Sequence, residues 1–293
     1  SDPIVALDKK PDVKAFFDTH SNTISYVVKD PDSQACAVVD SVMELDYAAG
    51  RISHDGADAI IKYIKDNELE LAWIIETHVH ADHLSGAPYI QNVLGGKIGI
   101  GEYIQEIQDT FGKVFNEGTE FQRDGSQFDC LFKDGDHYQV GDMSCQAIHT
   151  PGHTPACMVH VMGDAAFAGD TLFMPDGGSA RADFPGGDAG QLYDSIVRVL
   201  SLPDAMRLFV CHDYGPGGRT IAWETTIGDE KANNIHIGGN ASREAFIKMR
   251  EERDKQLAMP QLIIPSLQVN MRAGQIPEDE DGNMTLKIPV NKL

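Results

Sequence analysis

The segment THVHADH at residues 77–83 places four potential metal ligands within six residues: His78, His80, Asp82 and His83. Imidazole and carboxylate groups together suit zinc, iron or manganese. Alternate side chains of an extended segment point the same way, so His78 and His80 project together, and the turn that follows brings Asp82 and His83 to the same cavity. Because so many desolvated polar groups are costly without an ion, the segment predicts a metal site.

Three later residues of the same chemical types each follow a predicted strand. His153 lies in a tight turn after residues 144–148, Asp170 follows residues 166–168, and His212 follows residues 207–211. Ligand sites of open α/β folds gather beyond the carboxyl ends of strands. We therefore expect all seven side chains to meet at one edge of a sheet.

The elements that must position these residues alternate along the chain. Strands are predicted at residues 23–28, 36–39, 71–77, 97–100, 138–140, 144–148, 158–161, 166–168 and 207–211. Helices are predicted around residues 59–64 and at 87–93, 104–115, 191–200 and 243–257. This alternation predicts α/β layering in a single domain, residues 1–293, with a carboxyl-terminal extension from about residue 240. The Pro-rich tail, residues 260–293, is predicted to be a loop.

Composition excludes several function classes. The chain has 293 residues, 42% of them hydrophobic, and its 45 acidic and 24 basic residues give a net charge of −21. Such a chain repels phosphate, so nucleic acid is not expected as a partner. Neither an apolar run long enough to span a membrane nor a signal peptide is visible, so no membrane association is expected. Cytoplasmic location and reduced thiols are predicted from five scattered cysteines without a CxxC pair: Cys36, Cys130, Cys145, Cys157 and Cys211.

The pattern HxHxDH followed by a distant His, Asp and His resembles the metallo-β-lactamase superfamily, over about residues 20–215. The resemblance implies an αββα sandwich with a metal site at one edge between its two sheets. It places the superfamily's ligands on His78, His80, Asp82, His83, His153, Asp170 and His212. The other histidines match no ligand position and are interpreted as structural or surface residues: His20, His54, His137, His149, His160 and His236.

Family alone does not fix a reaction. The net charge argues against the ribonuclease members, and flavodiiron members carry Glu where this chain has His80. Two chemistries with glutathione-linked substrates remain, the thioester hydrolysis of glyoxalase II and persulfide dioxygenation. Residues 181–184, Arg-Ala-Asp-Phe, are similar to the persulfide dioxygenases, whereas glyoxalase II typically carries Arg-Phe-Phe-Glu there. Residues 211–214 and 225–233 also resemble the dioxygenases, and Gly178-Ser179-Ala180 resembles a bacterial, β-lactamase-like subgroup of them.

This resemblance implies one Fe(II) per chain, held by His78, His153 and Asp170. It also implies that glutathione persulfide, O2 and water are converted into sulfite and glutathione. Two histidines and one carboxylate leave three coordination positions open for substrate and oxygen. His80, Asp82, His83 and His212 would then orient the ligands or form a second metal site. Spacing alone equally permits two zinc ions and thioester hydrolysis, and a non-catalytic metal-binding or sensing protein is the third alternative.

Glutathione carries carboxylates, so an acidic protein needs local cations to bind it. Arg181 and Arg219 lie in loops beside predicted ligands and are the predicted carboxylate-binding residues, with Tyr214 as a further donor. The alternative is that the two arginines pair with Asp183 or Glu224 to fix their loops. The family resemblance also allows a homodimer.

Overall fold

Two six-stranded sheets pack face to face in the computed structural model, which describes residues 7–293; the first six residues of the predicted domain lie outside the described residues. The first sheet runs β1 (Asp12–Asp18), β2 (Thr23–Lys29), β3 (Ala35–Val39), β6 (Glu70–Ile75), β8 (Lys97–Gly101) and β9 (Cys130–Phe132). The second runs β10 (His137–Val140), β11 (Met143–His149), β12 (Met158–Met162), β13 (Ala165–Phe167), β14 (Arg207–Phe209) and β15 (Glu224–Thr226). A small sheet joins β5 (Arg51–Ser53), β4 (Val42–Asp46) and β7 (Leu84–Ser85).

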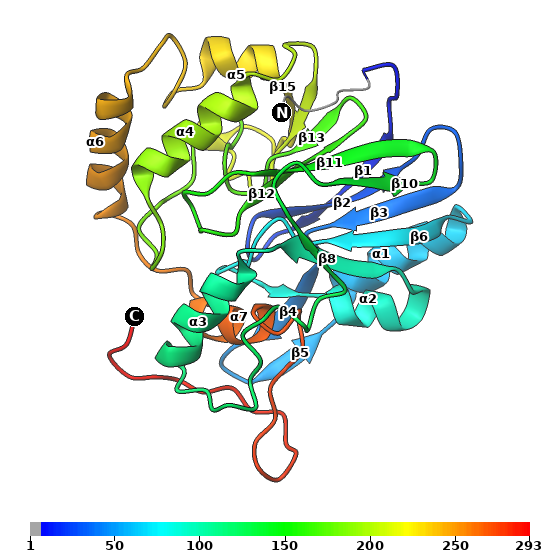
Figure 1. Ribbon diagram of the computed structural model, residues 1–293, viewed down its shortest axis with the longest axis vertical. Helices are drawn as coiled ribbons and strands as arrows, with labels where there is room; N and C mark the ends of the chain where they lie inside the picture. Colours follow the sequence, from blue (N-terminus) through cyan, green and yellow to red (C-terminus); the bar gives the residue numbers. More distant parts are fainter. Residues whose placement is uncertain (1–6) are drawn as a thin grey trace.

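Helices cover the outer faces of both sheets, so the chain has the αββα sandwich predicted for it (Figure 1). The first sheet is covered by α1 (Asp55–Asp66), α2 (Ala87–Leu94), α3 (Ile104–Val114) and α7 (Ile263–Asn270). The second is covered by α4 (Ala189–Leu200), α5 (Ile227–Asn233) and α6 (Arg243–Asp254), with one short 3-10 turn at Pro216–Gly218. No helix among residues 7–293 is long and apolar enough to cross a membrane.

The period of two in a strand explains how one sheet faces two cores. In β2, Tyr26 and Val28 enter the core between the sheets, whereas Val27 enters the core beneath α1–α3. On the other side of the molecule, α4 buries Leu192 and Ile196 against the second sheet, and the Asp188 side chain caps its first turn by accepting from the Gln191 N–H.

Several predicted elements have other bounds in the structure, among them the strand predicted at residues 207–211, which ends at Phe209. The strand predicted at residues 71–77 ends at Ile75, because the Thr77 N–H donates to the Asp40 carboxylate instead of to a neighbouring strand. The helix predicted at 243–257 ends at Asp254. The loop predicted for residues 260–293 was wrong at Ile263–Asn270, which form α7; apart from Ile264 its residues are buried, so it lacks the polar face that marks a helix in sequence. Pro265 lies in its first turn, where no intrahelical N–H is required.

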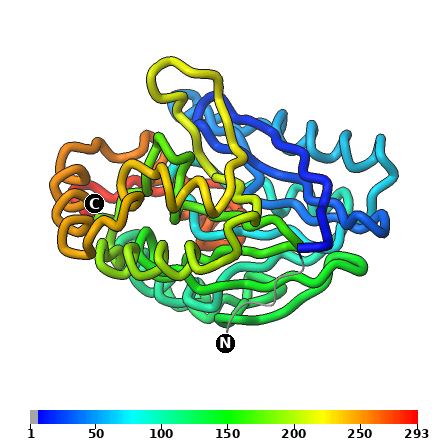
Figure 2. Tube along the Cα trace, turned by 90° about the horizontal axis from the view of Figure 1, so that it is seen from above, coloured from blue at the N-terminus to red at the C-terminus, as the bar shows by residue number. Residues whose placement is uncertain are grey.

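The strands end together at one edge of the sandwich. The loop after β14 returns beside the turn between β1 and β2, where Ile24 N–H donates to the Cys211 oxygen and Asp213 N–H to the Asn22 oxygen. Figure 2 shows this loop, in yellow, next to the blue amino-terminal strands. The segments that follow β6, β11, β13 and β14 consequently face one another.

Candidate metal centre

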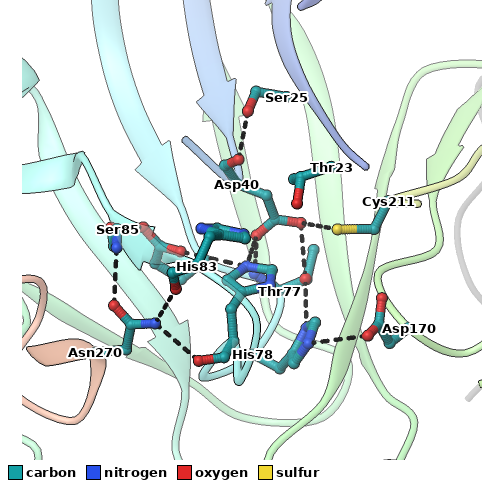
Figure 3. A network of polar contacts seen from close by, with 12 residues as sticks. Thr23, Ser25, Asp40, Thr77, His78, His83, Ser85, Asp170, Cys211 and Asn270 are labelled. Carbon is teal, nitrogen blue, oxygen red and sulfur yellow. Dashed lines mark hydrogen bonds and ion pairs between the residues drawn. The ribbon is translucent and has the colours of Figure 1, made fainter. Parts of the chain in front are cut away.

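Asp40 anchors the segment that begins the histidine cluster. It follows β3 in a left-handed backbone conformation (φ 54°), and its two carboxylate oxygens accept from the Thr77 N–H (2.9 Å) and the Thr77 hydroxyl (2.8 Å). The Thr77 hydroxyl also lies 2.9 Å from Nδ1 of His78 (Figure 3). These bonds direct Nε2 of His78 away from Asp40 and toward Asp170.

The structure brings His78, His153 and Asp170 together from three distant parts of the chain. Their ligand atoms lie within 4.8 Å of one another, and all three residues are buried. Oδ2 of Asp170 is 3.5 Å from Nε2 of His78 and 3.2 Å from Nε2 of His153. Two imidazole nitrogens and a carboxylate oxygen thus converge on one point.

The polar atoms at this point fit a metal ion. Nε2 of His78 and Oδ1 of Asp170 are buried without a hydrogen-bond partner, which is costly unless an ion binds there. Nδ1 of His153 is 2.7 Å from the main-chain oxygen of Arg181, so it carries the proton and leaves Nε2 free to coordinate. Burial opposes ionisation of Asp170, yet the imidazoles of His212, His78 and His153 hold its pKa well below the ordinary range. The donor set therefore suits a divalent cation.

The remaining predicted ligands surround the first three. Nε2 of His212 lies 3.2 Å from Oδ1 of Asp170 and 3.5 Å from Oδ2 of Asp82. His80, Asp82 and His83 form another group whose ligand atoms lie within 4.8 Å, and Nε2 of His83 has no hydrogen-bond partner. Nε2 of His80, by contrast, is 2.9 Å from Oδ1 of Asp40. All seven candidates thus lie in one cluster, and His80 is held by a carboxylate outside it.

Several residues of the site escaped the sequence analysis. Asp40 follows a predicted strand as the ligands do, and that position could have identified it. Glu76 lies buried beside His80, with 3.6 Å between Oε2 and Nε2, and accepts from the Ser85 hydroxyl. Asn270 of α7 has no sequence signal, yet its amide donates to the main-chain oxygens of His80 and His83, both at 2.8 Å.

The family model of the metallo-beta-lactamase superfamily matches residues 19–212. The chain belongs to this superfamily. Among curated proteins it is 50% identical to a "Probable metallo-hydrolase" of Burkholderia pseudomallei, over 96% of this chain and 99% of that one. It is 44% identical to "Glyoxylase B2" of Dictyostelium discoideum, over 98% and 99%.

More distant members of the superfamily include the human "Persulfide dioxygenase ETHE1, mitochondrial", 28% identical over 89% of this chain and 88% of that one. The crystal structure of ETHE1 from Myxococcus xanthus superposes with a TM-score of 0.72 at 28% identity, over 90% of this chain and all of that one. The superfamily match ends at His212, so α5, α6 and α7 lie beyond it.

The two arginines predicted to bind glutathione both pair with carboxylates. Arg181 is bidentate to Asp183 (2.7 and 2.9 Å) and donates to the Ala258 oxygen, which uses three of its five N–H groups. Arg219 uses all five, on Asp176, Asp213 and the Thr220 oxygen. A carboxylate could bind Arg219 only by displacing one of its present partners. Arg181, by contrast, keeps two N–H groups that make no hydrogen bond to the protein.

Tyr214 lies beside His212 of the cluster. The residue is 61% exposed, and its ring is stacked with that of His212, with 6.3 Å between centroids. Phe173 meets the Tyr214 ring edge-on at 6.3 Å. An exposed aromatic ring with a hydroxyl therefore lies next to the buried ligand cluster.

Proposed function

We propose that this protein is an Fe(II)-dependent persulfide dioxygenase that oxidises glutathione persulfide. The observation that carries the proposal is the group of His78, His153 and Asp170, two imidazoles and one carboxylate whose free atoms converge. This ligand set is the one found in mononuclear non-haem iron oxygenases, where three positions remain open for substrate and oxygen. Bound there, Fe(II) would supply those positions and the redox chemistry.

The balanced reaction is GSSH + O2 + H2O giving GSH, SO3²⁻ and two protons. The two sulfurs of the persulfide together lose four electrons, which reduce O2. The outer sulfur loses five, and the glutathione sulfur gains one as the S–S bond breaks and it leaves as the thiol. No external reductant is required. The protein's own thiols are not needed as reductants, and burial raises the pKa of Cys157 to about 12. Burial and the Asp40 carboxylate raise the pKa of Cys211 well above that of an ordinary thiol.

The chain's residues would hold and orient the reacting groups. His78 is fixed by Thr77, and His153 by the Arg181 main-chain oxygen, so both imidazoles present Nε2 to the same point. Asp40 holds Nε2 of His80, which favours an outer role for this histidine. Arg181, with two uncommitted N–H groups, is the candidate to bind a glutathione carboxylate. The similarity to persulfide dioxygenases over most of their length supports the same reaction.

A dinuclear thioester hydrolase acting on acyl-glutathione is the second candidate. The unpartnered Nε2 of His83 and the approach of His212 to both Asp82 and Asp170 favour it, because these groups could hold a second ion. The names of the 44–50% identical relatives point in the same direction.

The two candidates are separated by the effect of single substitutions on the two reactions. For the dioxygenase, protein with the His83→Ala substitution should keep O2 uptake and sulfite formation within about tenfold, whereas His153→Ala should abolish both. His137→Ala, at an exposed position of β10, serves as the control. Cleavage of an acyl-glutathione thioester, lost equally in His83→Ala and His153→Ala, without O2 uptake on glutathione persulfide, would identify the hydrolase instead.

A further inference from the structure

The orientation of His153 depends on a main-chain segment, residues 179–182, that lies far from it in sequence. Nδ1 of His153 donates to the Arg181 oxygen at 2.7 Å. This bond selects the tautomer that leaves Nε2 free, and it fixes the rotation of the ring. Whatever holds the Arg181 carbonyl in place therefore also holds Nε2 of His153 beside Asp170.

Two charged residues of α6 hold this segment on either side of Arg181. Arg250 donates through Nη1 to the Ser179 oxygen at 2.8 Å, and the Ala182 N–H donates to Oδ2 of Asp254 at 3.0 Å. Arg250 and Asp254 are themselves joined by a 2.8 Å bond from Nε to Oδ1. The pair thus binds one backbone acceptor, the Ser179 oxygen two residues before Arg181, and one backbone donor, the Ala182 N–H directly after Arg181.

The remaining polar groups near Ser179 are also satisfied. Its N–H donates to Nδ1 of His236 at 2.9 Å, and burial together with Arg250 and Arg253 lowers the pKa of His236 to about 4, which keeps the ring a neutral acceptor. Ser179 is consequently bound at both its main-chain N–H and its oxygen, and the Ala182 N–H is bound as well, which limits how far the Arg181 carbonyl between them can shift.

The Arg250–Asp254 pair of α6 is buried, and burying two charges costs free energy of desolvation. The side chains of Arg250 and Asp254 are only 1% and 4% exposed. A buried ion pair adds little net stability over a well-packed apolar pair, because removing both charges from water offsets their attraction. What an apolar pair could not do is bind both a main-chain oxygen and a main-chain N–H of residues 179–182.

We propose that the Arg250–Asp254 pair positions the metal ligand His153 through residues 179–182. The pair touches neither metal nor substrate and acts through the backbone. The proposal rests on the role of His153 as a metal ligand in the proposed function. It extends the site beyond the superfamily match to a helix on the outer layer of the sandwich.

The test compares Fe(II) affinity in full-length variants, measured without oxygen by competition with a chromophoric chelator. The double variant Arg250→Met/Asp254→Leu removes both charges together, which avoids a lone buried ion, and loses both contacts to the segment. We expect its Kd for Fe(II) to rise about 10–100-fold, the usual cost of losing an outer partner of a metal ligand. Its metal-free form should retain a native circular dichroism spectrum.

The control is Arg243→Met/Asp194→Leu, which removes an ion pair between α6 and α4 whose side chains are 47% and 61% exposed. It should leave the Kd within about twofold. Asp254→Asn is the milder variant for use if the double variant does not fold. The side-chain amide of this variant would have a single oxygen in place of the two carboxylate oxygens, so it can accept from either the Ala182 N–H or Arg250, but not from both. The Kd of this variant for Fe(II) should therefore rise at least threefold.

Unchanged Fe(II) affinity in folded Arg250→Met/Asp254→Leu, or in Asp254→Asn, overturns the proposal. His153→Ala separates this failure from failure of the proposed function. If His153→Ala loses iron and the α6 variants do not, only the positioning role is refuted. If His153→Ala also binds iron normally, the ligand assignment itself is wrong and both proposals fall.

Discussion

The side-chain amide of Asn270 donates to the main-chain oxygen of His83 at 2.8 Å, across 187 positions of the sequence. The same amide donates to the His80 oxygen, and its own oxygen accepts from the Ser85 N–H, each at 2.8 Å. One side chain of the final helix thus closes the loop that carries four of the predicted ligands (Figure 3).

Substituting Asn270 by Asp should destabilise this loop. The carboxylate keeps the shape but cannot donate to two buried carbonyl oxygens, so we expect the free energy of unfolding to fall by about 2–4 kcal/mol. Urea denaturation of the metal-free protein measures the change. Asn92→Asp, at an exposed position of α2, should cost less than about 0.5 kcal/mol. Equal stability of the two variants would show that Asn270 does not secure the loop.

How far the sequence could predict this site depends on the kind of residue. His78, His80, Asp82 and His83 are close together, and their spacing alone indicates a metal site. Asn270 and Arg250 are single polar residues whose partners are main-chain atoms, and only tertiary packing decides which ones. The fold was predictable because α4 and β2 carry clear periodic patterns, whereas buried α7 has none.

Arg219 should prove more important for stability than for substrate binding. Its five N–H groups hold Asp176 and Asp213, and the Asp213 side chain is only 2% exposed. Arg219→Met leaves a buried carboxylate short of its strongest donors, so we expect a loss of about 1–3 kcal/mol in the free energy of unfolding. Arg243→Met, which breaks an exposed pair, should cost at most about 1 kcal/mol. A smaller loss for Arg219→Met than for Arg243→Met would contradict this assignment.

Arg181, unlike Arg219, should matter more for substrate binding than for stability. Removing its guanidinium in Arg181→Ala takes away the two uncommitted donors, so KM for glutathione persulfide should rise at least tenfold. The iron content should change far less, because His153 bonds to the main-chain oxygen of Arg181, which Ala retains. Steady-state kinetics and metal analysis on the same preparation provide both numbers. Parallel losses of iron and substrate binding would mean that the Arg181–Asp183 pair only fixes the loop.

Stability should fall as the pH drops from 7 to 5, in part because of His160. This imidazole is fully buried in β12, its Nδ1 lies 2.8 Å from the Tyr138 hydroxyl, and its pKa is lowered by burial to about 4. The unfolded chain takes up a proton near pH 6.5, whereas the folded chain does so only near pH 4, so acid favours unfolding in this interval.

The variant His160→Gln keeps a polar partner for the Tyr138 hydroxyl, since an amide can donate or accept, and removes the titration. Its free energy of unfolding should therefore decline less than that of the wild type between pH 7 and pH 5, by on the order of 1–2 kcal/mol. Urea denaturation of metal-free protein at both pH values gives the comparison. Identical declines would mean that His160 is protonated in the folded protein.

The central claim is that His78, His153 and Asp170 hold one ferrous ion. The most direct test is elemental analysis of protein purified without added metal and without oxygen, combined with O2 uptake on glutathione persulfide. We expect close to one iron per chain, with uptake proportional to the iron content. Two zinc ions per chain in protein that cleaves a glutathione thioester and consumes no O2 would contradict the account.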